Sequence, residues 1–176
     1  NYDTSIAVAG THGKTTTTSM LSHILLKGEC DPTISVGGIL PAIGGNIRVG
    51  QSETFLTEAC EYTNSFLSFF PTLGIILNMD ADHLDFFKDI DDIRHSFRKF
   101  AELLPADGAL IINADTPKYE MVAENLPCKV ITYGLEHDAE YSASDITYDE
   151  FGHPTFHVLH NGADIGICSL KVPGIH

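Results

Sequence analysis

A glycine-rich loop stands between a predicted strand and a predicted helix near the beginning of the chain. Residues 5–9 form a short apolar run, and residues 14–27 place apolar side chains at helical spacing before Gly28. The loop between them reads Gly10-Thr11-His12-Gly13-Lys14-Thr15-Thr16. Glycines before a helix let backbone N–H groups point toward an anion, and the helix dipole stabilises negative charge at that end. The loop therefore predicts a phosphate site, in which Lys14 contacts the β- and γ-phosphates and the Thr15 hydroxyl contacts Mg²⁺.

The loop is shorter than the usual phosphate-binding motif. That motif has a glycine five positions before its second glycine, and Val8 occupies that place here. A glycine turn with an incidental lysine is the alternative interpretation. The agreement of strand, glycines, Lys-Thr pair and helix favours the phosphate site, and the absence of a G-x-G-x-x-G pattern favours a nucleoside triphosphate over a dinucleotide.

Four further apolar runs predict buried strands of a parallel sheet. Each run is too short for a helix and rich in β-branched residues, and helical patterns lie between them. The runs are residues 54–57, 73–77, 109–112 and 129–133, and helices are expected at residues 90–103 and 116–125. This alternation predicts an α/β fold with a mostly parallel, doubly wound sheet.

From about residue 141 the apolar pattern alternates as in antiparallel strands. An Asn161-Gly162 turn separates residues 155–159 from residues 165–170. We therefore expect a small C-terminal antiparallel β hairpin region. Residues 37–45 are rich in glycine and lack periodicity, so we expect an ordered loop there.

Acidic residues follow the run 54–57, where a parallel strand would end. Glu58 and Glu61 are the two candidates for a metal ligand there, because P-loop enzymes place an acidic ligand at the end of such a strand. A solvated charge at a strand end is the alternative for each residue.

A second polar cluster follows the run 73–77. It reads Asn78-Met79-Asp80-Ala81-Asp82-His83-Leu84-Asp85. Because the carboxyl ends of parallel strands lie at one edge of a sheet, the cluster predicts a second Mg²⁺ site. Mg²⁺ prefers oxygen ligands, so chemistry alone favours Asp82 or Asp85 over His83.

The charge balance limits the classes of partner. The chain has 10 Lys and Arg residues against 24 Asp and Glu residues, a formal net charge of −14, which repels nucleic-acid phosphates and anionic lipid. No apolar run approaches the ~20 residues of a spanning helix, and no signal-peptide pattern opens the chain. Four scattered cysteines without a C-x-x-C pair favour free thiols. We expect a cytoplasmic domain with no nucleic-acid or membrane partner.

Several short motifs occur together in an order typical of one enzyme family. They are residues 9–18, Asp31-Pro32-Thr33, Val36-Gly37-Gly38, Asn46-Ile47-Arg48, Glu58-Ala59-Cys60-Glu61, Ser65-Phe66-Leu67, Asn78 and Asp82-His83-Leu84-Asp85. In this combination the chain resembles the Mur ligases. The loop sequence Thr-His-Gly-Lys, rather than Thr-Asn-Gly-Lys, is unlike the loop of the later ligases of that pathway.

The resemblance implies a three-domain, ATP-dependent ligase of peptidoglycan biosynthesis. Residues 1–176 would be its central ATP-binding domain, with the UDP-sugar domain and the amino-acid domain outside this chain. ATP and Mg²⁺ are the implied cofactors. UDP-N-acetylmuramate and L-alanine are the implied substrates of the full-length enzyme, joined through an acyl phosphate. The central domain alone is expected to be inactive in ligation.

The resemblance also implies roles for individual residues. Lys14 would bind the β- and γ-phosphates, Thr15 and Glu58 one Mg²⁺, and His83 a second Mg²⁺ near the sugar carboxylate. The nucleotide would contact Gly10, Thr11, His12, Gly13, Lys14, Thr15, Thr16 and Asn78. The UDP-sugar would face Asn46, Arg48 and Ser65. For the second metal, the resemblance favours His83 over the carboxylates that chemistry alone would choose.

Three other functions are compatible with the sequence. A murein-tripeptide recycling ligase carries a similar loop, a small P-loop kinase could act alone, and a regulatory module could bind nucleotide without chemistry. The pairing of Glu58 with His83 argues against the regulatory module. The sequence predicts no particular oligomeric state.

Overall fold

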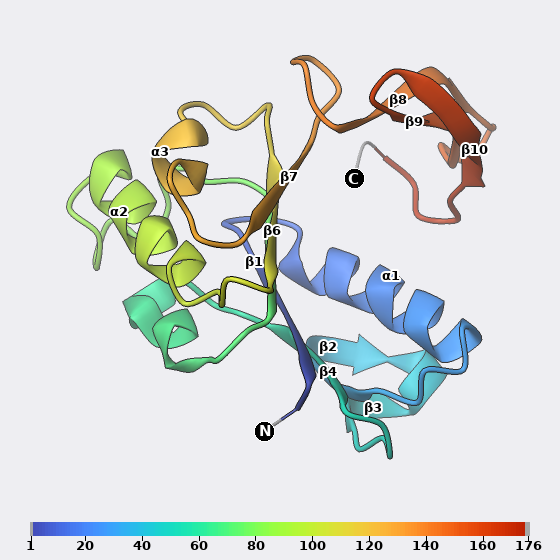
Figure 1. Ribbon diagram of the computed structural model, residues 1–176. Coiled ribbons are helices and arrows are strands. Elements are labelled where there is room, and N and C mark those ends of the chain that lie inside the picture. The colour runs from blue at the N-terminus through green and yellow to red at the C-terminus, as the bar shows by residue number, and fades with distance from the viewer. Residues whose placement is uncertain (1, 175–176) are drawn as a thin grey trace.

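The computed structural model describes residues 2–174 and contains one ten-stranded sheet (Figure 1). The strand order is β10-β9-β8-β7-β6-β5-β1-β4-β2-β3. Its centre is parallel and consists of β1 (Thr4–Ala9), β4 (Thr54–Glu58), β5 (Leu73–Ile76), β6 (Ala109–Asn113) and β7 (Lys129–Tyr133). The predicted parallel strands are therefore confirmed, with ends that differ by one residue or none.

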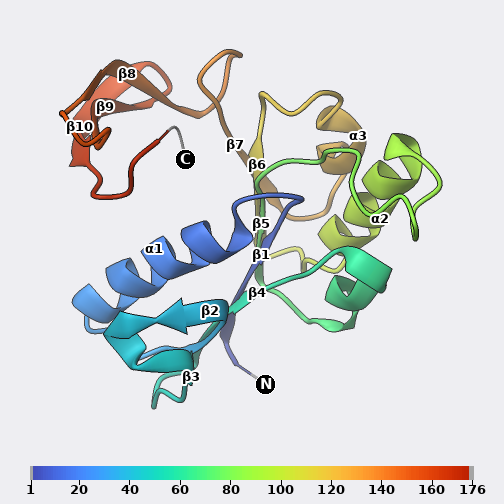
Figure 2. The same ribbon diagram turned by 180° about the vertical axis from the view of Figure 1, so that it is seen from behind.

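Two layers of helix cover the sheet, one on each face. Helix α1 (Lys14–Lys27) lies on one face, and helices α2 (Ile90–Ala101) and α3 (Glu120–Ala123) lie on the other (Figures 1 and 2). This arrangement confirms the doubly wound α/β fold. Among residues 2–174, no helix is both long and apolar enough to cross a membrane.

Each face of the sheet has its own hydrophobic core. On the α1 side, Leu21 and Leu25 pack against a small cluster from the central strands, Ile6, Val8, Leu56 and Ile75. The α2 side holds a larger cluster. In it the Phe66 ring stacks on the Phe100 ring with centroids 5.0 Å apart, and it packs edge-on against the Phe97 ring with centroids 5.3 Å apart. Because these three rings are fully buried, they fix α2 and the 3₁₀ segment Tyr62–Ser68 against the sheet.

The glycine-rich stretch expected to be a loop is instead mostly strand. Strand β2 (Thr33–Leu40) contains Gly37 and Gly38, and after a 3₁₀ turn at Pro41–Ile43 the chain returns as β3 (Gly45–Arg48). Residues 33–35 pair in parallel with β4, and β3 pairs antiparallel with β2. The prediction was wrong because these contacts come from partners distant in sequence, whereas the local composition indicates turns.

The helix expected at residues 116–125 is shorter than predicted. Lys118 has φ 62° and Asn125 has φ 55°, both in the left-handed region. An α-helix cannot pass through such residues, so only Glu120–Ala123 are helical. Residues 116–119, at the start of the predicted helix, are not helical.

The C-terminal region is antiparallel, as predicted, but has three strands. Strands β8 (Tyr141–Tyr148), β9 (Pro154–His160) and β10 (Ala163–Ser169) pair in sequence order. A single parallel pair, Tyr133 with Tyr141, joins β8 to β7. The region is therefore a small sheet attached to the edge of the parallel sheet.

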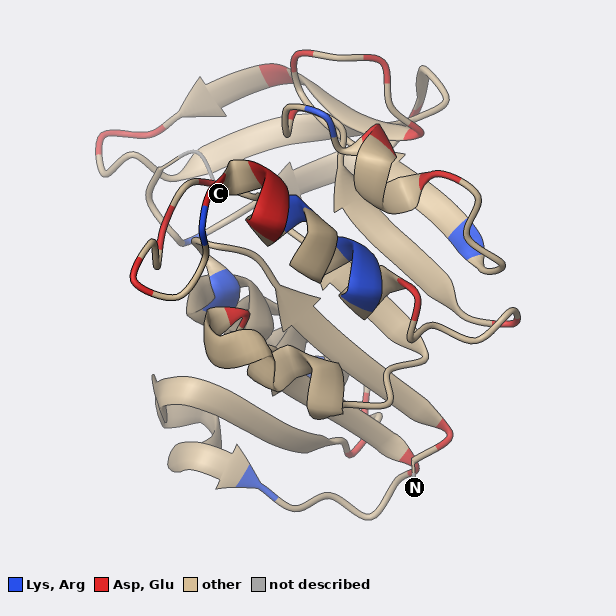
Figure 3. Cartoon of the chain, turned by 90° about the vertical axis from the view of Figure 1, so that its left-hand side faces the viewer, with Lys and Arg blue, Asp and Glu red and all other residues tan. Residues whose placement is uncertain are grey.

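Charged residues are distributed over loops, helices and strands, with acidic residues in excess (Figure 3). Helix α2 begins with Asp91 and Asp92 in its first turn and has Arg98 and Lys99 in its last. This order complements the helix dipole. The Asp89 side chain caps α2 by accepting hydrogen bonds from the N–H groups of Asp91 and Asp92.

Candidate functional site

The carboxyl ends of β1, β4 and β5 bring three loops to one edge of the sheet. Each strand is parallel to its neighbour, so the residues that follow Ala9, Glu58 and Ile76 come together. Most of the residues expected to bind nucleotide or metal lie in these loops. The parallel topology therefore assembles the site from residues distant in sequence.

The loop after β1 contains two glycines with positive φ angles. Gly10 has φ 146°, and Gly13, at the N-cap of α1, has φ 82°. A Cβ on Gly10 would lie 3.0 Å from Cβ of Leu77, so the loop needs glycine there on two grounds. Among residues 2–174, no side chain caps the start of α1. The first N–H groups of the helix are thus left for a ligand.

Asn78 connects this loop to the end of β5 by hydrogen bonds. Its Oδ1 accepts a hydrogen bond from the N–H of His12 at 2.8 Å, and its Nδ2 donates to the His12 carbonyl at 3.0 Å. The Thr11 N–H also donates to the Asn78 carbonyl at 3.2 Å. The Asn78 side chain is therefore occupied in holding the loop.

The Lys14 ammonium group is directed into the loop. Its Nζ donates to the carbonyl oxygens of Gly10 at 2.5 Å and Thr11 at 3.2 Å, and to Oε2 of Glu61 at 2.9 Å. Because the side chain is only 16% exposed, these partners hold it firmly. Lys14 thus lies where phosphate oxygens bound by the loop would meet it.

Glu58 lies beside the first turn of α1 and accepts two hydrogen bonds. The Thr15 hydroxyl donates to its Oε2 at 3.1 Å, and the N–H of Gly37 donates to its Oε1 at 2.6 Å. The carboxylate and hydroxyl oxygens form the oxygen donor set that Mg²⁺ prefers. Gly37 was not predicted as a contributor, because its contact depends on β2 being a strand.

Glu61 has different partners from Glu58, although both were candidates for a metal ligand. Its carboxylate is 2% exposed and lies between Nζ of Lys14 and Nε2 of His83, which is 3.7 Å from Oε1. The ring of Tyr62 packs on the His83 ring with centroids 4.7 Å apart. The structure therefore separates the two glutamates, one beside Thr15 and the other between a lysine and a histidine.

The two aspartates favoured by ligand chemistry are engaged in local hydrogen bonds. Asp82 accepts from the N–H of His83 at 2.7 Å, and Asp85 accepts from the Tyr62 hydroxyl at 2.8 Å. The hydrogen bond to Asp85, with the charge of that carboxylate, raises the pKa of Tyr62. Both hydrogen bonds help to shape the turn that presents His83.

The three residues expected to face the UDP-sugar lie apart from this group. Asn46 is exposed on β3, and Arg48 binds the Asp31 carboxylate and the Pro32 carbonyl. The Ser65 hydroxyl is 3.0 Å from both the Cys60 and Tyr62 carbonyls. Among residues 2–174, no hydrogen bond or ion pair joins any of the three to the loop 10–16.

Within residues 2–174, no three His, Cys, Asp or Glu residues converge as a ready-made metal site. A Mg²⁺ at a phosphate loop takes only one or two protein oxygens, and phosphate and water complete its coordination. Thr15 and Glu58 fit that requirement as a donor pair.

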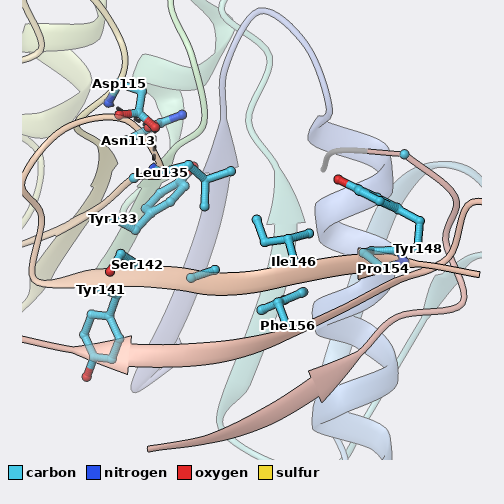
Figure 4. A pocket seen from close by; sticks show the side chains of 13 residues that line it. Asn113, Asp115, Tyr133, Leu135, Tyr141, Ser142, Ile146, Tyr148, Pro154 and Phe156 are labelled. Atoms are coloured by element: carbon cyan, nitrogen blue, oxygen red, sulfur yellow. Dashed lines mark hydrogen bonds between the residues drawn. The ribbon is translucent and has the colours of Figure 1, made fainter. Parts of the chain in front are cut away.

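A pocket that sequence reasoning missed lies farther along the same edge. Its volume is about 400 Å³, and its lining comes from the ends of β6 and β7 and from the small sheet, including Tyr133, Ile146 and Phe156 (Figure 4). Burial raises the pKa of Tyr133 to about 12, with a further contribution from the Asp115 charge. Asn113, the last residue of β6, and Asp115 repeat the Asn-x-Asp spacing of Asn78 and Asp80 after β5, and this repeated spacing was the available signal.

Comparison with known proteins identifies the family. The family model described as the Mur ligase middle domain matches residues 8–176. A UDP-N-acetylmuramate–L-alanine ligase of Lachnospira eligens is 61% identical over 176 residues, which cover 99% of this chain and 38% of that protein. The chain thus spans about 38% of the length of the curated relatives it matches.

Solved structures agree with the sequence comparison. The UDP-N-acetylmuramate-alanine ligase of Thermotoga maritima superposes with a TM-score of 0.83 at 28% identity, covering 98% of this chain and 38% of that one. The UDP-N-acetylmuramate:L-alanyl-gamma-D-glutamyl-meso-diaminopimelate ligase of Neisseria meningitides superposes with a TM-score of 0.84 at 27% identity, covering 97% and 56%. The chain therefore belongs to the Mur ligase family, whose middle domain it matches from residue 8 onward.

Proposed function

We propose that this chain is the central ATP-binding domain of a longer ligase that joins L-alanine to UDP-N-acetylmuramate. The observation that carries the proposal is the assembly of Lys14, the Thr15–Glu58 pair and His83 at one edge of the sheet. The identity of 61% to a UDP-N-acetylmuramate–L-alanine ligase supports the choice of substrates. Two further domains, for the UDP-sugar and the amino acid, would complete this cytoplasmic enzyme.

The proposed reaction has two stages. The γ-phosphoryl group of ATP is transferred to the carboxylate of the muramyl group, giving an acyl phosphate and ADP. The amine of L-alanine then attacks the acyl carbon, the nitrogen loses a proton, and phosphate leaves. Catalysis of this kind depends on holding the reactants in line and neutralising charge on the phosphoryl oxygens.

The residues of this chain would supply that environment. The Lys14 ammonium and the uncapped N–H groups of α1 bind phosphate oxygens, and Asn78 keeps the loop in place. Thr15 and Glu58 would hold one Mg²⁺, and the family resemblance assigns a second to His83. Bound Mg²⁺ supplies electrostatic stabilisation of the phosphates.

The proposal is tested by replacing the loop lysine in the full-length protein. Phosphate release is measured with Mg-ATP, UDP-N-acetylmuramate and L-alanine. We expect Lys14→Ala to lower turnover at least about 100-fold, because a charge-stabilising donor is lost. Lys27→Ala, at the exposed end of the same helix, is the matched control and should retain activity. Retained ligation by Lys14→Ala would contradict the proposal.

A second acceptor is included because of the structural similarity to the Neisseria meningitides enzyme. The same assay is run with the murein tripeptide in place of L-alanine. Turnover that requires L-alanine supports the alanine ligase, whereas turnover only with the tripeptide assigns the chain to a recycling ligase. Phosphate release without any acceptor would indicate a different ATPase.

A further inference from the structure

Glu61 is a buried carboxylate placed between two residues of the proposed site. It is 2% exposed, with Oε2 2.9 Å from Nζ of Lys14 and Oε1 3.7 Å from Nε2 of His83. Lys14 lies on the phosphate loop after β1, and His83 lies on the loop after β5. Glu61 is therefore in contact with both the proposed phosphate site and the proposed second metal site.

The hydrogen-bond capacity of Lys14 is already filled. An ammonium group has three N–H donors, and here its partners are the carbonyls of Gly10 and Thr11 and the carboxylate of Glu61. A phosphate oxygen can therefore gain a hydrogen bond from Lys14 only if one of these is given up. The two carbonyls belong to the loop that surrounds the ammonium, whereas Glu61 comes from the segment after β4. Replacing Glu61 by phosphate would thus leave the contacts between the ammonium and its own loop intact.

A displaced Glu61 would need another cationic or hydrogen-bonding partner. A buried carboxylate without one is strongly destabilised, all the more so beside a triphosphate. Nε2 of His83 is such a group, and it needs to approach by less than 1 Å to reach hydrogen-bond distance. A carboxylate that accepts from one ring nitrogen fixes the histidine ring and leaves the other nitrogen free to bind a metal.

We propose that Glu61 is a positioning residue that exchanges Lys14 for His83 as its partner when nucleotide binds. Nucleotide would in this way orient the histidine that serves the acceptor side of the site. The exchange at Lys14 depends only on nucleotide binding, whereas the consequence for ligation rests on the function proposed above.

The first test measures nucleotide affinity in the full-length protein, without an acceptor. Glu61→Gln keeps the size of the side chain but removes the charge that competes with phosphate for Lys14. We expect calorimetric titration with Mg-ATP to give binding about tenfold tighter than in the wild type. Unchanged or weaker binding in Glu61→Gln would overturn the proposal, as would a wild-type protein that binds no nucleotide.

Glu140 offers a matched control. It also lies between a lysine and a histidine, 3.7 Å from Nζ of Lys129 and 3.3 Å from Nε2 of His160, but it belongs to the connection before β8. Glu140→Gln should leave nucleotide affinity unchanged. An equal gain in affinity in both variants would show a general charge effect and overturn the assignment to Glu61.

Thermal unfolding separates the exchange from a general loss of structure. Without nucleotide, Glu61→Gln should melt below the wild type, because Lys14 has lost its counter-ion. With saturating Mg-ATP the difference should close, since phosphate then occupies Lys14 in both proteins. If the melting temperature of Glu61→Gln stayed equally far below that of the wild type with Mg-ATP, Glu61 would be purely structural and the proposal would be overturned.

Turnover provides the final test. We expect Glu61→Gln to lower kcat roughly 10- to 100-fold while KM for ATP falls, because the histidine loses the group that orients it. Unchanged kcat would overturn the link to His83. Tighter nucleotide binding by Glu61→Gln, in a protein whose wild type ligates no acceptor, would uphold the exchange and refute only the proposed function.

Discussion

At the scale of single residues, the candidate site depends on how one glycine places one carboxylate. The N–H of Gly37 donates a hydrogen bond to Oε1 of Glu58 at 2.6 Å, and the Thr15 hydroxyl donates one to Oε2. A Cβ on Gly37 would lie only 2.7 Å from Oε2 of Glu58. The absence of a side chain at position 37 is therefore what lets the carboxylate lie next to α1.

Gly37→Ala should displace the Glu58 carboxylate without unfolding the protein. The atom that must move is the end of a flexible side chain, so we expect the free energy of unfolding to change by less than about 1 kcal/mol. Mg-ATP affinity, measured by titration calorimetry, should fall about tenfold, because the proposed metal ligand is moved. Gly38→Ala is the control, since its Cβ meets only a Thr15 methyl group at 3.4 Å. Equal affinities in the two variants would refute this account.

At the scale of elements, loops after neighbouring parallel strands use related polar residues to fix different segments. Asn78, after β5, binds the phosphate loop. Asp115, after β6, accepts from the N–H groups of Leu135, Glu136 and His137, and Nδ1 of His137 lies 3.0 Å away. Asp115 thus organises the connection from β7 to the small sheet.

The stability contributed by Asp115 should depend on pH. Burial favours the neutral acid, but the N–H bonds from Leu135, Glu136 and His137 and the His137 side chain outweigh it and lower the pKa of Asp115. A lowered folded-state pKa gives stability that is present above the ordinary pKa, about 3.9, and is lost as pH falls through the lowered value.

Asp115→Asn tests this dependence. Urea unfolding at pH 7 should show a loss of about 2 kcal/mol, because the amide replaces an ionised acceptor. The gap between variant and wild type should narrow as pH falls below about 3.9 toward the lowered pKa. A gap that is independent of pH would refute the role of the ionised carboxylate.

At the scale of the whole molecule, the ten-stranded sheet consists of two unequal parts. Both buried hydrophobic clusters lie around β1, β4, β5 and β6 and the helices that cover them. Within residues 2–174, neither cluster includes a residue of β8, β9 or β10. One strand pair, Tyr133 with Tyr141, connects the small sheet to the parallel sheet. The small sheet therefore has fewer buried contacts to stabilise it than the parallel part of the sheet.

Native-state hydrogen exchange should reveal this division. We expect the amides of β8–β10 to exchange through an opening of lower free energy than the amides of β1 and β6, since little apolar surface is exposed when the small sheet opens. The measurement is exchange by mass spectrometry or NMR at several low urea concentrations. One common opening free energy for all these strands would show that the two parts unfold together.

The sequence alone determined the parallel centre of the fold and the phosphate loop. Short apolar runs, helical spacing and the glycines at 10 and 13 act locally, through backbone conformation and the burial of nearby side chains. For that reason the strands 4–9, 54–58, 73–76, 109–113 and 129–133 and the helix 14–27 could be predicted almost to the residue. The family resemblance rested on the same local motifs.

Tertiary structure decided what depends on distant partners. It made residues 33–40 a strand, because β3 and β4 supply hydrogen bonds that outweigh the local preference of glycine for turns. It also distinguished the two glutamates: Glu58 meets Gly37, 21 positions away, and Glu61 meets Lys14, 47 positions away. No local sequence pattern predicts such contacts, because the two residues come together only when strands distant in sequence pair in the sheet.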